Sequence, residues 1–219
     1  MRGDSVKSIG LALFIGTGLF ALAAGDRKPP RKAISPARSV DRIDPSRGAS
    51  TWKARIAPLN ALNLGNSGDR TEHVLWRLEN GNIDAISPKL AVLMIGTNNH
   101  MSSPPEVTAR DIRLIVKQLR TKLPQTKVLV LAIFPRGGGD DDVARQINMR
   151  VNDLIADIGD GKMVHYLNIN EAFLNGRRLR QSLIPDGTHP NEKGYAAWAE
   201  AMEPTISKLL GDNPVLGLE

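Results

Sequence analysis

An aspartate and a histidine near the C-terminal end of the chain have a spacing that suits acid–base chemistry. Asp186 and His189 lie three residues apart in the segment DGTHPN, directly before an expected helix. In a tight loop, this spacing lets the carboxylate bind one ring nitrogen, which fixes the tautomer and leaves the other nitrogen free to act as a base. Both residue types are also common as helix caps and solvated loop side chains, so the pair alone does not specify a reaction.

Two further positions could supply hydrogen-bond donors to a developing negative charge. Gly68 lies in the segment GNSGDR, and Asn98 lies in the segment GTNNH. Acyl transfer generates an oxyanion that needs two or three fixed donors, and an exposed backbone N–H and an Asn amide are suitable. Each residue taken singly is equally typical of an ordinary turn, so the argument depends on all of these segments lying together.

Short apolar runs that alternate with amphipathic segments would position these residues. The expected strands are residues 61–64, 90–95, 127–134 and 163–169, and the expected helices are residues 71–79, 105–123, 141–157 and 192–210. The helix over 141–157 is expected to bury Val143, Ile147, Val151, Leu154 and Ile155. Continuously apolar strands joined by helical crossovers predict an α/β fold with a parallel sheet that is covered on both faces. Functional residues in such sheets gather beyond the carboxyl ends of the strands.

Four segments together resemble the SGNH or GDSL hydrolase family, and especially its platelet-activating-factor acetylhydrolase-like branch. They are PLNALNLGNSGDRTEHVLWRLENG, AVLMIGTNNH, LAIFPRG and DGTHPNEKGY, and the resemblance runs from about Trp52 to Leu210. It implies a three-layer, flavodoxin-like α/β/α sandwich that hydrolyses esters with a Ser-His-Asp triad and needs no cofactor or metal. The family's oxyanion glycine and asparagine fall on Gly68 and Asn98, its acid on Asp186 and its base on His189.

The family's substrates and assembly give further expectations. The resemblance suggests a small ester substrate, such as an acetylated glycan or lipid. Because some relatives associate as dimers, it also suggests a homodimer.

The nucleophile region departs from the family pattern. In the family, the serine lies in a Gly-Asp-Ser motif directly after a first apolar strand, but no such unit precedes Trp52 here. Counting back from Trp52 places the nucleophile at Ser39, in the segment PARSV, where Ala and Arg replace Gly and Asp. The alternatives are another serine, Ser5, Ser35 or Ser46, and a chain that lacks a competent nucleophile and acts as a binding or scaffold module.

The N-terminal residues have the pattern of a targeting segment. Residues 8–25, SIGLALFIGTGLFALAAG, form an uncharged run that basic residues precede and small residues close. This predicts a signal peptide or membrane anchor over residues 1–25 and an exported or membrane-anchored protein. The alternative is that Leu11–Ile15 is the first strand of the sheet. Residues 26–50 are expected to be a Pro/Arg-rich linker, residues 51–210 the hydrolase-like domain, and residues 211–219 a tail.

The charge distribution argues against a nucleic-acid site. The net charge is +6 and the pI about 9.8, but the basic residues gather in the segment 26–50, with Trp52 as the one aromatic residue nearby. Single-strand sites interleave basic and aromatic side chains. We therefore expect a solvated linker or a contact with a membrane surface, and binding of nucleic acid by residues 26–50 is the weaker hypothesis. The chain has no cysteine, which excludes disulfide and thiol chemistry.

Other polar positions have less specific roles. Arg136, in the segment PRG, and Asn99 are candidates for substrate binding. The segment GGGDDD before the third helix is expected to cap that helix rather than to bind a metal, because a cation site needs converging oxygens. Trp76 and Arg77 are expected to serve in packing and in a salt bridge.

Overall fold

The computed structural model describes residues 11–15 and 48–211. These residues build a five-stranded, fully parallel sheet of order β2-β1-β3-β4-β5. The strands are β1 (Leu11–Ile15), β2 (Leu62–Asn63), β3 (Leu90–Met94), β4 (Lys127–Leu131) and β5 (Val164–Leu167). This strand order is that of flavodoxin-like folds, which confirms the predicted fold class.

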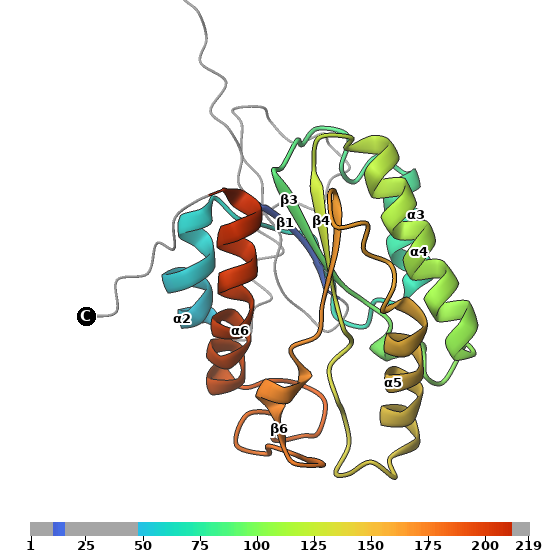
Figure 1. Ribbon diagram of the computed structural model, residues 1–219, viewed down its shortest axis with the longest axis vertical. Helices are drawn as coiled ribbons and strands as arrows, with labels where there is room; N and C mark the ends of the chain where they lie inside the picture. The colour runs from blue at the N-terminus through green and yellow to red at the C-terminus, as the bar shows by residue number, and fades with distance from the viewer. Residues whose placement is uncertain (1–10, 16–47, 212–219) are drawn as a thin grey trace, which may run out of the picture.

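Helices cover the sheet on both faces and complete three layers (Figure 1). The helices α2 (Ala49–Thr51) and α6 (Glu192–Leu210) contact each other on one face. The helices α3 (Thr71–Glu79), α4 (Pro105–Lys122) and α5 (Val143–Ile155) lie side by side on the other face. The loop after β4, the start of α5 and the small hairpin β6 (Leu174–Asn175)–β7 (Arg178–Leu179) lie at the lower end of the view. The carboxyl ends of the strands therefore point toward this end of the molecule.

The core follows from the composition of the strands. All five residues of β3 are buried, as are the last four of β4, because continuously apolar strands suit a sheet that is covered on both faces. An aromatic cluster extends the core below the sheet: the ring of Phe134 lies 4.4 Å from that of Phe173 and 4.8 Å from that of Trp198. This cluster ties the segment after β4 to α6.

The first strand corrects one expectation. Leu11–Ile15 pairs in parallel with β3 along its whole length and with β2 through Ala12 and Leu13. The expectation that the first strand is not recognisable is therefore wrong, and for these five residues the alternative interpretation as a first strand holds. The strand is not followed directly by a Gly-Asp-Ser motif. The rest of the predicted targeting segment, Ser39 and most of the predicted linker lie outside the described residues. Helical structure begins at Ala49, within the last two residues of the predicted linker, and continues through a π-helical and a 3-10 turn to Leu59.

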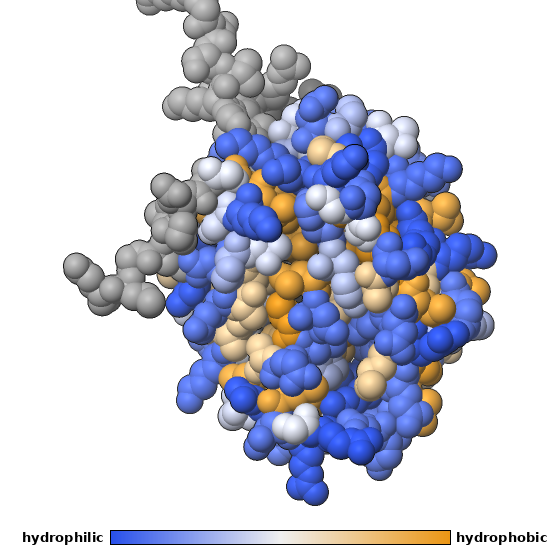
Figure 2. Space-filling view, in the orientation of Figure 1, coloured by the Kyte–Doolittle hydropathy of each residue, from blue (hydrophilic) through white to orange (hydrophobic). Residues whose placement is uncertain are grey.

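The surface agrees with a globular domain. The face shown in Figure 2 is mostly hydrophilic, and its apolar side chains gather in a central band and along one edge. Trp76 is an exception to the expected packing role, because it is 63% exposed on α3. Within the described ranges, no helix is both long and apolar enough to cross a membrane.

Candidate active site

The predicted acid–base pair is formed. His189 Nδ1 lies 2.7 Å from Asp186 Oδ2. The other carboxylate oxygen of Asp186 accepts the backbone N–H groups of Thr188 at 2.9 Å and of His189 at 2.7 Å. Gly187 makes this tight loop feasible because its φ is +74°, a conformation that residues with a Cβ rarely adopt. The loop thus fixes the carboxylate, and the carboxylate fixes the ring.

The electrostatics of the pair favour an ionised acid. Burial alone would raise the pKa of Asp186, but the hydrogen bonds from the His189 N–H, the His189 ring and the Thr188 N–H outweigh it and lower the pKa to about 2. The carboxylate is therefore charged at neutral pH and stabilises a positive charge on the imidazole. With Nδ1 bound to Asp186, Nε2 is the nitrogen left to exchange a proton.

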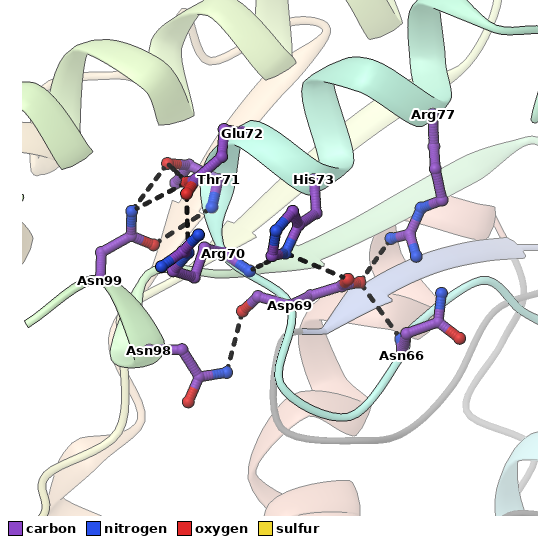
Figure 3. A network of polar contacts seen from close by, with 9 residues as sticks. All are labelled: Asn66, Asp69, Arg70, Thr71, Glu72, His73, Arg77, Asn98 and Asn99. Carbon is purple, nitrogen blue, oxygen red and sulfur yellow. Dashed lines mark hydrogen bonds and ion pairs between the residues drawn. The ribbon is translucent and has the colours of Figure 1, made fainter. Parts of the chain in front are cut away.

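The two oxyanion candidates lie in neighbouring segments (Figure 3). The Asn98 amide donates from Nδ2 to the backbone carbonyl of Asp69 at 2.8 Å, so it lies beside the residue that follows Gly68. Gly68 has a φ of +80°, and a side chain added there would meet no atom within 4 Å. The backbone at Gly68 thus borders open space, and its left-handed conformation explains why glycine suits this turn.

A buried ion pair holds the Gly68 turn against α3. Arg77 Nη2 lies 2.5 Å from Asp69 Oδ2, and both side chains are 9% exposed. The same oxygen of Asp69 accepts the backbone N–H of Asn66 at 3.3 Å. The expected salt-bridge role of Arg77 is confirmed.

Asn99 fixes the other side of the same segment. Its Oδ1 accepts the backbone N–H of Thr71, and its Nδ2 donates to Thr71 Oγ1 and to Glu72 Oε2. Asn99 is 1% exposed. It therefore supports the start of α3, and its role in substrate binding stays a prediction.

Arg136 connects the segment of Asn98 with that of His189. Its Nη1 donates to the Thr97 carbonyl at 3.1 Å and to Thr97 Oγ1 at 3.3 Å, and its Nη2 donates to Thr188 Oγ1 at 3.3 Å. Arg136, Thr97 and Thr188 also border a small, mainly apolar pocket whose other lining residues are Met94, Ile95, Ile133, Phe134 and Pro135.

The acidic segment before α5 does what was expected of it. Asp142 is the N-cap of α5 and accepts the backbone N–H of Arg145 at 2.9 Å. Asp140 forms ion pairs with Arg145 and Arg177. Among the described residues, no group of three or more acidic, histidine or cysteine side chains is arranged to hold a metal ion.

Two contributions to the site were missed at the sequence level. Asn148, on the buried face of α5, donates from Nδ2 to Thr97 Oγ1 and to the Phe134 carbonyl. Glu192, three residues after His189, accepts the backbone N–H of Gly48 at 2.8 Å and that of Thr51 at 3.0 Å. An asparagine at core spacing in a helix was the one available signal for the first, and nothing in the sequence indicated the second.

The candidate site therefore includes five of the predicted residues. Asp186 and His189 form one unit, Gly68 and Asn98 form a second, and Arg136 bridges the loops that carry them. A parallel sheet with an acid–base pair beyond the carboxyl ends of its strands defines an α/β protein with a candidate site for acid–base catalysis, as the hydrolases of this class have.

The comparison with known proteins specifies the family. The GDSL-like Lipase/Acylhydrolase family matches residues 28–197, and the chain belongs to this family. It is 36% identical over 164 residues to the platelet-activating factor acetylhydrolase IB subunit alpha1 of Pongo abelii, covering 74% of this chain and 70% of the relative. It is 37% identical over 165 residues to the alpha2 subunit of Rattus norvegicus, covering 74% and 71%. The expectation of an enzyme that hydrolyses carboxylic esters is confirmed at this level.

Solved structures confirm the fold. A putative acylhydrolase from Bacteroides fragilis superposes with a TM-score of 0.67 at 16% identity and covers 91% of this chain and 88% of its own. A catalytic mutant of an acetylxylan esterase from Geobacillus stearothermophilus gives a TM-score of 0.63 at 18% identity, over 96% and 98% of the two chains.

Proposed function

We propose that this protein is a serine-dependent esterase that removes acetyl or other short acyl groups, with His189 as the base and Asp186 as its orienting acid. The observation that carries the proposal is the 2.7 Å contact between His189 Nδ1 and Asp186 Oδ2 in a loop that Arg136 ties to the segment of Asn98. The family and the acetylhydrolase and acetylxylan esterase relatives support the same chemistry.

The proposed reaction proceeds through an acyl-enzyme. His189 Nε2 takes the proton of the serine hydroxyl while the oxygen attacks the ester carbonyl. The Gly68 N–H, the Asn98 amide and the serine's own N–H stabilise the oxyanion. The intermediate collapses, and the alcohol leaves with a proton from the imidazolium. A water molecule, deprotonated by the same nitrogen, then releases the acid and restores the serine.

Ser39 is the proposed nucleophile, and the contacts of Glu192 support this assignment. Glu192, which lies three residues after His189 in the sequence, accepts a hydrogen bond from the backbone N–H of Gly48. Gly48 therefore lies against the first residue of α6, close in sequence to the base. Ser39 is nine residues upstream, and nine extended residues span up to about 30 Å. The length of chain thus allows Ser39 to reach His189.

The proposed substrate is a small ester such as an acetylated glycan or lipid. The pocket bordered by Phe134, Ile133 and Met94 is small and mainly apolar, which suits a short acyl group. The names of the relatives indicate both substrate classes: one curated relative acts on platelet-activating factor, and a structural relative acts on acetylxylan.

The second candidate function is a non-catalytic binding or scaffold module. It is favoured by one observation, namely that Ala37 and Arg38 precede Ser39 where the family has glycine and aspartate. Loss of the serine of a triad lowers the rate by orders of magnitude, so a chain without a competent nucleophile would retain the fold and the pocket without turnover.

Labelling with a fluorophosphonate distinguishes the two functions. The full chain and its Ser39→Ala and Ser46→Ala variants would be labelled, and the modified residue would be mapped by mass spectrometry. The esterase proposal expects labelling at Ser39 that Ser39→Ala abolishes and Ser46→Ala retains. Labelling at a different serine would keep the esterase and replace its nucleophile. A folded sample that remains unlabelled and hydrolyses no acetyl ester would contradict the esterase and support the binding module.

A further inference from the structure

Arg136 contacts both of the loops that the proposed reaction needs. Its Nη1 donates to the carbonyl and hydroxyl oxygens of Thr97, the residue before Asn98. Its Nη2 donates to Thr188 Oγ1, in the residue before His189. Among the described residues, no other side chain bonds to both Thr97 and Thr188. Arg136 thus lies between the oxyanion segment and the base.

The backbone next to Arg136 strengthens the same connection. The N–H of Gly137 donates to the Gly187 carbonyl at 2.8 Å, which joins the loop after β4 to the loop of the acid–base pair. The two backbones are also in close contact here, because a Cβ on Gly187 would lie 3.5 Å from the Gly137 backbone, an ordinary van der Waals distance. The segment Arg136–Gly137 therefore spans the gap between the two loops with side-chain and backbone bonds.

The Thr97 end of this connection is itself held in place. Asn148, buried on α5, donates to Thr97 Oγ1 and to the Phe134 carbonyl. Thr97 is thus fixed from two sides, and a shift of Arg136 would be transmitted to Asn98 on one side and to His189 on the other.

We propose that Arg136 is a positioning residue that sets the separation of the Asn98 amide from the His189 ring. The inference rests on the proposed esterase function for its kinetic consequence. The chemistry of the side chain fits this role, because a guanidinium offers several donors in a rigid planar fork. Its partners are the oxygens of Thr97 and Thr188 and, at 3.4 Å, the ring nitrogen Nδ1 of His100. No carboxylate of the described residues forms an ion pair with it. Lysine carries the charge but lacks the fork, so it can satisfy one end of the connection and not both.

The kinetic test compares Arg136→Gln and Arg136→Lys with a matched control. Arg150→Gln is the control, since Arg150 is an exposed arginine on α5 that forms an ion pair with Glu106 on α4. With 4-nitrophenyl acetate, Arg136→Gln is expected to lower kcat by roughly 10- to 100-fold, the effect of a displacement on the order of 1 Å in the site. The KM should stay within about twofold, Arg136→Lys should recover part of kcat, and Arg150→Gln should match the unmodified chain. A raised KM with unchanged kcat would overturn the proposal, because Arg136 would then bind substrate directly.

A spectroscopic test works without turnover. The imidazole nitrogens of His189 and the side-chain amide of Asn98 would be followed by NMR in the full-length chain and in Arg136→Gln and Thr188→Ala. The proposal expects shifted or broadened signals at both sites in Arg136→Gln, and at His189 in Thr188→Ala. Unchanged spectra in a folded Arg136→Gln variant would overturn it. Shifted spectra in a chain that hydrolyses no ester would support the positioning role and count against the proposed function alone.

Discussion

The two oxygens of Asp186 have separate roles. One accepts two backbone N–H groups of its own loop, and the other accepts the His189 ring. The backbone therefore sets the plane of the carboxylate, which in turn selects the tautomer with the proton on Nδ1. Because the pKa of Asp186 is lowered to about 2, the carboxylate keeps its charge wherever an esterase would operate.

Replacing the Asp186 carboxylate by an amide keeps the shape of the side chain and removes its charge, so it tests the role of the charge. Asp186→Asn can keep the loop, but it can donate to Nδ1 and thereby favour the wrong tautomer of His189. We expect kcat/KM for 4-nitrophenyl acetate to fall by roughly 10²- to 10⁴-fold, as for comparable triads. Asp160→Asn is the matched control, because Asp160 is likewise held by backbone N–H groups of its own loop, those of Lys162, Met163 and Val164, where Asp186 accepts two. A fall that is equal in both variants would contradict the specific role of Asp186.

The lowered pKa also predicts how stability depends on pH. A group whose pKa is lower in the folded state contributes stability above its unfolded value, and that contribution is lost as the pH falls toward the folded value. For Asp186 the window runs from 3.8 down to about 2. The difference in unfolding free energy between the unmodified chain and Asp186→Asn should be constant near neutral pH and shrink through this window. Urea titrations at several pH values would measure it, and a difference that persists to the acid end would count against the prediction.

Asn98 should matter to rate and little to stability. Its amide lies 2.8 Å from the Asp69 carbonyl, beside the Gly68 turn. Asn98→Ala is expected to lower kcat by about 10²- to 10³-fold, the usual effect of removing one oxyanion donor. Asn80→Ala removes a comparable bond, from an exposed amide to the Trp76 carbonyl, and should leave kcat unchanged. A rise in KM alone for Asn98→Ala would mean that the amide binds the ground state and not the oxyanion.

At the scale of elements, the contacts that hold α3 in place lie at and just before its N-terminus. Asp69 and Arg77 form a buried ion pair across two turns, and Asn99 binds the first residue of the helix, Thr71. The Gly68 turn is therefore attached to a rigid helix and not to a free loop. This attachment explains how a backbone N–H at a glycine could hold a fixed direction.

Removing one charge of the buried Asp69–Arg77 pair should lower the unfolding free energy more than removing both charges. Arg77→Met leaves the Asp69 carboxylate buried without its cation, and we expect a loss of roughly 3–5 kcal/mol in unfolding free energy. The double variant Asp69→Asn/Arg77→Met removes both charges and should recover a large part of that loss. Urea unfolding of the three chains measures the difference. Equal stability of the single variant and the unmodified chain would show that Asp69 is not buried as described.

The elements show which features a sequence reveals. The bounds of α3 and α6 were predicted because apolar periodicity and the flanking Asn and Gly residues mark them locally. The buried face of α5 was predicted only in part: Val151 and Ile155 are buried as expected, but Val143 is 70% exposed. The face also includes three polar residues, Arg145, Asn148 and Asn152. Both asparagines bond to the backbone just after β4: Asn152 to Ile133 and Asn148 to Phe134. Such partners are distant in sequence, so a polar residue on a core face looks like an interruption of the pattern. For the same reason, Asp186 and His189 could be paired from spacing alone, whereas the bridge formed by Arg136 could not.

At the scale of the whole molecule, the sheet is organised around its first strand. β1 lies between β2 and β3, and each of its neighbours on the sheet pairs with it in parallel. The run LALFI was ambiguous because it lies inside a longer apolar stretch, residues 8–25, which has the pattern of a signal segment. A run of apolar residues is typical both of a buried strand and of a membrane segment. Only the pairing with β3 distinguishes the first strand of a sheet from a signal segment for these residues.

A shortened chain tests which interpretation applies. If β1 belongs to the sheet, a chain that starts at residue 26 loses the strand between β2 and β3. The two-residue β2 then has no partner in the sheet, and the apolar β3 becomes an open edge, which favours aggregation. We expect the full chain to unfold cooperatively in urea and the shortened chain to show no cooperative transition. Equal stability of the two chains would remove β1 from the fold, and residues 1–25 would then be available for export or anchoring.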